Sequence, residues 1–169
     1  MVNSDELLCV VDEYDNPIQP RPRHEVFKKG HWRRTAHVWI INSKNQVLCQ
    51  QRSLKKDMSP GMWEAAVSGH LSPGDDYFSG AVREVEEETG LKIKKSDLNL
   101  IKIYKDHKSR EYRGIFYCKL DVKTHQIKSE ADEVEKVKLI HFRTVKKYLK
   151  SHPSWISDDY QSEVLSIFS

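Results

Sequence analysis

Six acidic side chains lie within a stretch of 14 residues near the middle of the chain: Asp75, Asp76, Glu84, Glu86, Glu87 and Glu88. Like charges as close as these repel one another on a helix. A stable domain tolerates them when a cation sits among them, and hard divalent ions such as Mg²⁺ take carboxylate oxygens as ligands, usually together with substrate phosphates. The alternative is an ordinary helix with a solvated acidic face. The cluster therefore predicts either a divalent-cation site or an exposed acidic surface.

The spacing within the cluster favours a shared face. We expect a helix over residues 76–89, ended by Gly90. On that helix Glu84, Glu87 and Glu88 are three and four residues apart and share one side, whereas Glu86 points elsewhere. The opposite side carries apolar residues at helical spacing, which would face the core: Phe78, Ala81, Val82 and Val85. Gly69 and Gly74 bracket the preceding loop, which would return Asp75 towards the acidic face.

Residues 69–91, GHLSPGDDYFSGAVREVEEETGL, resemble the Nudix box, the signature of the Nudix hydrolases. Eight of its nine defined positions match in register: Gly69, Arg83, Glu84, Val85, Glu87, Glu88, Gly90 and Leu91. The one departure is Asp75, which stands where the pattern has glutamate and is one methylene shorter. The resemblance implies an α/β Nudix fold, which is an α/β/α sandwich with a mixed β-sheet and a loop-helix-loop box.

The same resemblance implies a site and a reaction. Glu84, Glu87 and Glu88 would bind Mg²⁺ or Mn²⁺, and the catalytic set would be Glu84, Arg83 and Glu87. The substrate would be a small molecule with a diphosphate linkage, either a nucleoside diphosphate derivative or a related X-diphosphate, whose strongly anionic transition state the metal neutralises. Glu84 or a later glutamate would take the proton of the attacking water, and Arg83 would hold the loop. Later segments offer three candidates for an additional carboxylate: Glu111, Glu133 and Glu135.

The stretch from Val11 to Leu91 is similar to the branch of this family that includes the isopentenyl-diphosphate isomerases. The similarity is carried by VVDEYDNPI, HVWIINSKNQVLCQQRS and PGMWEAAVSGH. An isomerase is therefore the alternative function, and a catalytically idle binding module is another. The isomerases have a catalytic cysteine where this chain has Ser68, and an alcohol hardly ionises near neutrality, whereas a thiol has a pKa of about 8.5. Their box is also usually eroded, whereas this one retains its arginine and glutamates. We therefore predict hydrolysis.

Five further residues are candidates through that branch. Arg52 and Lys56 align with residues that contact diphosphate, a role suited to a planar arginine donor backed by a lysine charge. The alternative is a solvated basic turn. His37 and His70 match histidines that bind a second metal in the isomerases, with Glu111 as the nearest match to an acidic ligand. Because isolated histidines more often form structural hydrogen bonds, we favour that role for them.

The rest of the sequence bounds the class of protein. With 169 residues, the chain is typical of a single domain, here 1–169 with a core of about 33–165. A net charge of +3 argues for neither a specific nucleic acid partner nor a membrane, and no apolar run approaches the about 20 residues of a membrane span. The N-terminus lacks the pattern of a secretory signal. Three scattered cysteines, Cys9, Cys49 and Cys118, are typical of reduced thiols, so we expect a cytoplasmic protein.

The pattern of apolar runs and turn signals predicts the elements that would position these residues. We expect strands over residues 7–12, 36–42, 46–51, 63–67, 98–104, 114–122 and 137–142. We expect helices over residues 23–29, 76–89, 144–150 and 157–168, and a charged loop over residues 105–113. Because strands and helices mix without a regular alternation, a mixed sheet flanked by helices is predicted.

Overall fold

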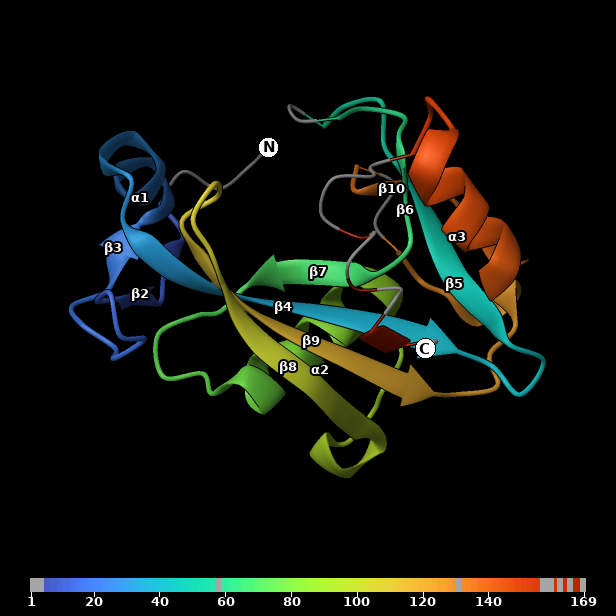
Figure 1. The fold of residues 1–169 in the computed structure, drawn as a ribbon, viewed down its shortest axis with the longest axis horizontal. Helices are drawn as coiled ribbons and strands as arrows, with labels where there is room; N and C mark the ends of the chain where they lie inside the picture. The colour runs from blue at the N-terminus through green and yellow to red at the C-terminus, as the bar shows by residue number, and fades with distance from the viewer. Residues whose placement is uncertain are drawn as a thin grey trace.

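The computed structural model describes residues 5–56, 59–129 and 132–155, together with Tyr160, Glu163, Ser166 and Ile167. At its centre is a mixed sheet (Figure 1) whose main strands lie in the order β10 (Val134–His141), β5 (Gln46–Arg52), β4 (Trp32–Ile41), β9 (Glu111–Lys119) and β8 (Leu98–Asp106). Strands β4 and β9 run parallel, and their neighbours pair antiparallel. The mixed sheet predicted from the sequence is thus confirmed.

Shorter strands extend this sheet along β4 and β5. They are β2 (Val10–Val11) and β7 (Val67–His70), which pair with β4, and β6 (Trp63–Glu64), which pairs with β5. A separate pair, β1 (Leu7–Leu8) with β3 (Arg21–Pro22), leads into helix α1 (Arg23–Lys29), whose bounds are those predicted. The predicted strand over 63–67 is therefore two strands, because its two halves pair with different neighbours.

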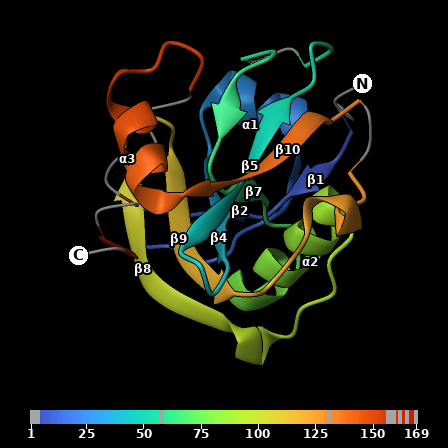
Figure 2. The same cartoon turned by 90° about the vertical axis from the view of Figure 1, so that its right-hand side faces the viewer.

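Two helices cover the opposite faces of the sheet (Figure 2), α2 (Tyr77–Thr89) on one side and α3 (Phe142–Ser151) on the other. Alternate residues of β4 point to opposite faces. Ala36 and Val38 belong to the core beneath α2, whereas Trp39 and Ile41 belong to the core beneath α3. This is the predicted α/β/α sandwich. No helix in the described part of the chain is both long and apolar enough to cross a membrane.

Local signals at both ends explain why α2 forms where it does. The Asp76 carboxylate accepts from the Ser79 amide at 2.7 Å, and the Ser79 hydroxyl accepts from the Asp76 amide at 2.9 Å, so each side chain caps the other's backbone. The helix ends at Gly90, whose φ of 68° is left-handed and whose amide donates to the Glu86 carbonyl at 2.8 Å. The helix predicted over 76–89 is confirmed, with Asp76 as its cap.

The charged loop predicted over residues 105–113 was wrong. Strand β8 continues to Asp106 and β9 begins at Glu111, so only a tight turn separates them. The charges are accommodated by partners elsewhere: the Lys105 ammonium lies 4.5 Å from the ring centroid of Trp32 and 5.3 Å from that of Tyr112. Because those partners are distant in sequence or in a neighbouring strand, the local composition did not reveal them.

Other boundaries moved by a few residues. Strand β4 starts at Trp32 rather than at 36, β9 ends at Lys119 rather than at 122, and α3 starts two residues before the predicted 144. The predicted strand over 7–12 is interrupted at Cys9, whose amide donates to the Leu71 carbonyl. The helix predicted over 157–168 lies largely outside the described residues.

Candidate active site

Arg83 is the centre of the acidic cluster on α2. Its Nη1 donates to Glu84 at 2.8 Å and to Glu87 at 2.9 Å, and its Nη2 donates to the His70 carbonyl oxygen at 2.9 Å. Its Nε and Nη2 both donate to Asp75, at 3.2 and 3.1 Å. The guanidinium therefore ties the loop before α2 to two of the predicted metal ligands and to strand β7.

Asp75 is held within the loop and the first turn of α2. Besides Arg83, its carboxylate accepts from the Ser72 amide at 3.0 Å and from the Ser79 hydroxyl at 3.2 Å. These contacts fix the entry of the chain into the helix. The aspartate side chain at this position thus binds Arg83 and two donors that are close to it in sequence, the Ser72 amide and the Ser79 hydroxyl.

Glu84 points from α2 against strand β7 and is only 7% exposed. Gly69 lies directly beneath it, since a Cβ at that position would stand 2.0 Å from the Glu84 Oε2 atom. Burial raises the pKa of Glu84 to about 7, and the Glu87 charge adds to the rise while Arg83 opposes it. The buried Glu84 carboxylate thus packs against β7 at a glycine, which has no side chain to displace it.

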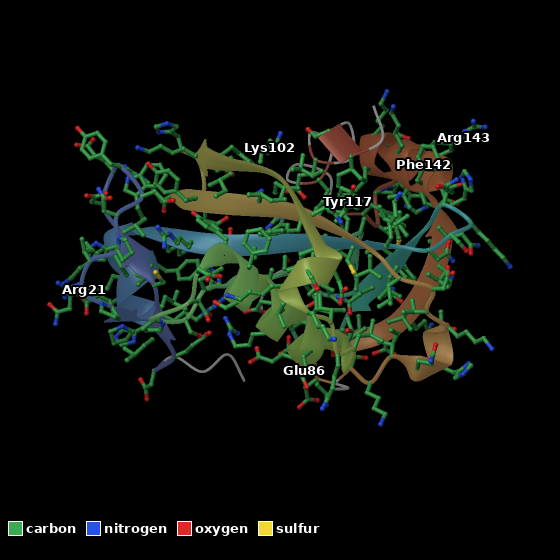
Figure 3. The ribbon with its side chains drawn as sticks, turned by 90° about the horizontal axis from the view of Figure 1, so that it is seen from below. Arg21, Glu86, Lys102, Tyr117, Phe142 and Arg143 are labelled. Atoms are coloured by element: carbon green, nitrogen blue, oxygen red, sulfur yellow. The ribbon has the colours of Figure 1, made fainter. Side chains whose placement is uncertain are left out.

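Glu88 points from α2 towards strand β5, where the Gln50 amide nitrogen donates to its Oε2 at 2.8 Å. Burial raises the pKa of Glu88 well above its ordinary value, and the charges of Glu64 and Glu84 raise it further. Glu87 differs because its side chain is 58% exposed. Glu86 points away from the sheet on the outer side of the helix (Figure 3).

Glu64 is a site residue that the sequence reasoning missed. It is buried in β6, pairs in register with Gln50, and accepts from the Arg52 Nη1 atom at 2.9 Å. Its charge raises the pKa of Glu88. The available signal was a lone acidic residue within the apolar run WEAAV, which is an unusual place for a carboxylate without a partner or a function.

The donor set fits a divalent cation. Glu84 and Glu88 are carboxylates whose ionised forms are disfavoured by burial and by neighbouring carboxylates, which is the situation that a bound cation reverses. Within the described residues, however, no three His, Cys, Asp or Glu side chains already converge in a metal-binding geometry. Arg83 instead binds Glu84 and Glu87. The guanidinium thus supplies positive charge where the predicted cation would.

The two predicted phosphate-binding residues are each paired with a carboxylate. Arg52 contacts Glu64, and Lys56 contacts Glu133, a residue of the segment before β10. The Ser53 amide also donates to the Glu133 carbonyl at 2.9 Å. Lys56 lies close enough to Glu88 to oppose the rise in its pKa. Arg52 and Lys56 therefore border the acidic cluster, whereas the Glu133 carboxylate is bound to Lys56.

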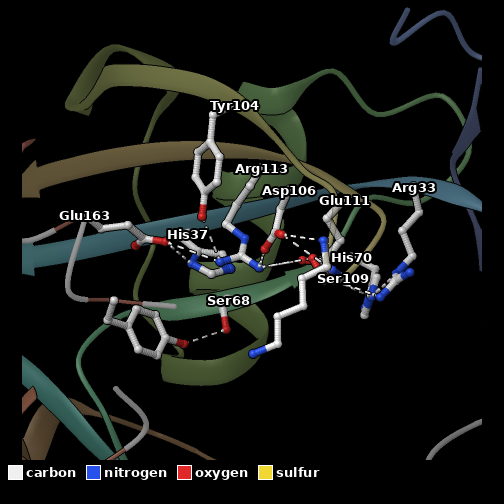
Figure 4. Close-up of polar contacts among 12 residues, drawn as sticks. Arg33, His37, Ser68, His70, Tyr104, Asp106, Ser109, Glu111, Arg113 and Glu163 are labelled. Carbon is white, nitrogen blue, oxygen red and sulfur yellow. Dashed lines mark hydrogen bonds and ion pairs between the residues drawn. The ribbon is translucent and has the colours of Figure 1, made fainter. Parts of the chain in front are cut away.

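Glu111 and His70 lie on the face of the sheet opposite α2, among arginines (Figure 4), and the His70 ring contacts that of Phe27 in α1. The Glu111 carboxylate accepts from Arg33 at 2.8 Å and from Arg113 at 2.9 Å. The His70 ring lies between Arg33, whose Nε donates to its Nε2 at 3.0 Å, and Arg23, 3.0 Å from its Nδ1. Burial and these two cations lower the pKa of His70 well below its ordinary value. Arginine charges thus fill the surroundings of this histidine.

His37 and Ser68 lie farther along the same face (Figure 4). The His37 Nδ1 atom is 2.8 Å from the Glu163 Oε1 atom, and the other oxygen of Glu163 accepts from Trp39 at 2.9 Å. The Ser68 hydroxyl lies 3.3 Å from the Tyr160 hydroxyl, which donates in turn to Glu64 at 3.3 Å. Burial raises the pKa of Tyr160 well above its ordinary value, so Ser68 has a weak acid as its neighbour.

Comparisons with known proteins bear on this arrangement. A family model described as the NUDIX domain matches residues 31–159. Nudix hydrolase 3 of Arabidopsis thaliana is 32% identical over an alignment of 163 residues that covers 88% of this chain and 21% of the relative. An isopentenyl-diphosphate Delta-isomerase of Pectobacterium atrosepticum is 37% identical over 85 residues, 50% of this chain and 48% of the relative. The chain thus spans about a fifth of the first relative and about half of the second.

A solved structure agrees with the fold. The crystal structure of a Deinococcus radiodurans protein superposes with a TM-score of 0.82, covering 97% of this chain and 100% of that one. Its sequence is 16% identical, so the likeness concerns the fold alone.

Proposed function

Because this chain belongs to the Nudix family, we propose that it is a Mg²⁺- or Mn²⁺-dependent hydrolase of a diphosphate linkage in a nucleoside diphosphate derivative or a related X-diphosphate. The observation that carries the proposal is the pair of carboxylates that α2 presents to the sheet, the buried Glu84 and the half-buried Glu88, with Lys56 near Glu88 and Arg52 bound to Glu64. Carboxylates attract a cation and the basic pair attracts phosphate, so both halves of a metal–diphosphate complex have partners at one place.

The chemistry follows from these groups. Glu84, Glu87 and Glu88 would hold the cation, which neutralises the anionic diphosphate and activates water when bound. Arg52 and Lys56 would exchange their present carboxylate partners for phosphate oxygens. Glu84 or a later glutamate would take the proton of the attacking water. Attack at phosphorus yields two phosphate-containing products.

Arg83 would act by positioning rather than by touching the substrate. In the structure it holds Glu84, Glu87, Asp75 and the backbone of β7 together. When the carboxylates turn to a cation, the bonds to Asp75 and to the His70 carbonyl would still anchor the loop. This agrees with the role that the resemblance implies for the arginine.

An isopentenyl-diphosphate isomerase remains the second candidate, because relatives of that name match about half of the chain. The surroundings of Ser68 favour hydrolysis instead. Its hydroxyl faces Tyr160, a still weaker acid than usual, and a serine cannot supply the proton chemistry of a thiol. Glu111 is bound by two arginines, which compete with any cation for its oxygens. Neither feature supports the alternative of a second metal site formed by His37, His70 and Glu111.

A substrate panel tests the proposal. Purified protein would be assayed with Mg²⁺ and Mn²⁺ against nucleoside di- and triphosphates, dinucleotide and sugar diphosphates, and isoprenyl diphosphates. We expect divalent-dependent release of phosphate-containing products, and no interconversion of isopentenyl and dimethylallyl diphosphate. Isomerisation as fast as hydrolysis would favour the alternative enzyme, and inactivity on every diphosphate would favour a binding module.

Two variants test the ligands. Glu87→Gln and Glu88→Gln should each lower kcat by about 100-fold or more with the fold intact, since each removes a charged ligand of the catalytic cation. Glu86→Gln is the matched control because it removes the same charge from the outer side of the same helix. Near-normal turnover in either of the first two variants would exclude that residue as a ligand.

We further propose that residues 1–169 form a single domain, with a core of about 33–165. A cytoplasmic location is proposed from the cysteines, since Cys9, Cys49 and Cys118 are all buried and free. Peptide mapping under non-reducing conditions, on protein taken directly from cells, should find all three as thiols.

A further inference from the structure

Gln50 has a buried oxygen with no partner beside the acidic cluster. The residue is 1% exposed, in the middle of strand β5. Its amide nitrogen donates to Glu88, whereas its Oε1 has no hydrogen-bond partner among the described residues. A buried carbonyl oxygen that is left without a hydrogen-bond partner destabilises the fold. We therefore expect the Gln50 oxygen to bind a ligand that the structure does not contain.

The orientation of the amide follows from Glu88. In the structure the Gln50 nitrogen donates to Glu88, so its oxygen points away from that carboxylate. A bound cation would favour the ionised carboxylate, which only accepts hydrogen bonds and therefore keeps the amide in this orientation. The two atoms belong to one small planar group, so the oxygen still lies beside the cluster. Glu64 is opposite Gln50 in register on β6 and adds a third nearby carboxylate. A ligand that completes this group must therefore accept electrons from several oxygens at once. A divalent cation does so.

We propose that Gln50 is a positioning residue that aims the Glu88 carboxylate, and that its Oε1 is a neutral oxygen ligand for the divalent cation. The inference rests on the metal-dependent function proposed above. An amide oxygen is an accepted ligand for hard cations. It adds a ligand without adding charge to a cluster that already holds Glu64, Glu84 and Glu88. The hydrogen bond from its nitrogen restrains one oxygen of Glu88 and leaves the other to face the cation.

The experiment measures Mn²⁺ affinity directly, by calorimetry and by the paramagnetic resonance of free Mn²⁺, on the full chain without substrate. Gln50→Met keeps the length of the side chain and removes both polar atoms. We expect it to weaken Mn²⁺ binding by about 10-fold or more, the usual effect of losing such a contact. Gln51→Met is the matched control, because the neighbouring amide binds the Gly61 carbonyl, away from the carboxylates; its Mn²⁺ affinity should be unchanged.

The variant Gln50→Glu distinguishes a role of Gln50 in binding the cation from a role in packing alone. A further carboxylate beside Glu88 should lower Tm in the absence of metal, and Mn²⁺ should raise Tm more than it does in the wild type. If an ordered water, rather than the cation, satisfies Oε1, Gln50→Met will bind Mn²⁺ within about twofold of the wild type, which overturns the proposal. Should Gln50→Met fail to fold, Gln50→Glu decides alone: a Mn²⁺-induced rise in Tm no larger than in the wild type overturns it.

The outcome is separable from that of the proposed function. Normal Mn²⁺ affinity in Gln50→Met, together with Mn²⁺-dependent hydrolysis by the wild type, would remove the role of Gln50 and leave the hydrolase intact. Weakened affinity in Gln50→Met, together with no hydrolysis of any diphosphate, would leave the metal site intact and remove the hydrolase.

Discussion

Replacing Glu84 with glutamine should stabilise the metal-free protein at neutral and alkaline pH. The buried carboxyl has a pKa of about 7 in the folded protein against an ordinary value of 4.5. The folded state therefore holds this proton more tightly than the unfolded chain does. The contribution of Glu84 to stability is accordingly lost as the pH rises from about 4.5 through 7, and it stays lost above. Glutamine, which resembles the protonated acid in shape, has no such dependence.

The size of the effect follows from the same values. A pKa difference of one corresponds to about 1.4 kcal/mol, so the rise from 4.5 to about 7 costs the ionised folded state about 3 kcal/mol at pH 8. The cost fades to almost nothing near pH 4. Because 1 kcal/mol shifts Tm by about 2–4 °C in a protein of this size, Glu84→Gln should melt roughly 6–12 °C higher than the wild type at pH 8.

The assay is urea unfolding of wild type, Glu84→Gln and Glu86→Gln in EDTA from pH 4 to 8, repeated with excess Mn²⁺. Without metal, the advantage of Glu84→Gln should grow with pH, whereas Glu86→Gln should follow the wild type. With Mn²⁺ the order should reverse, because only the glutamate offers the cation a charged ligand. Parallel stability profiles of Glu84→Gln and wild type in EDTA would show that burial does not raise the pKa of Glu84.

Three further changes have expected outcomes. Gly69→Ala places a methyl group 2.0 Å from the Glu84 Oε2 atom, so it should displace that carboxylate, destabilise the fold by about 1–3 kcal/mol in urea unfolding and weaken Mn²⁺ binding. Arg83→Met removes the cation between Glu84 and Glu87, so it should cost about 1–3 kcal/mol without metal, and Mn²⁺ should recover most of the loss. Glu133→Gln releases Lys56 for phosphate, so KM should fall about two- to fivefold in initial-rate assays; a large fall in kcat would instead assign Glu133 to catalysis.

Much of the acidic helix was predictable from sequence because its determinants are local. The reciprocal cap between Asp76 and Ser79, the left-handed Gly90 and the apolar stripe all act within a few residues. The spacing of the glutamates then fixed which of them share a side. Helix α1 and the hairpin formed by β4 and β5 were predictable for the same reason, since each depends on near neighbours.

Other parts depended on residues distant in the chain. The charged segment around Asp106 and Glu111 was taken for a loop because its partners, Trp32 and Arg33, come from β4. The residues that the sheet contributes to the acidic cluster are likewise far from α2 in sequence. Glu64 and Gln50 meet through the register of β6 with β5, and both reach Glu88 across the space between sheet and helix.

By itself the sequence determined a helix with carboxylates on one side, the family to which it belongs, and the kinds of ligand that such carboxylates attract. Only the tertiary structure decided that Glu84 is pressed against Gly69, that Glu88 is bound to Gln50, and that Glu87 stays exposed. The physical reason is the separation along the sequence of the residues that interact. Helix formation and capping are set by contacts within a turn or two, whereas burial, and with it the pKa of a carboxylate, is set by whatever distant strand packs against it.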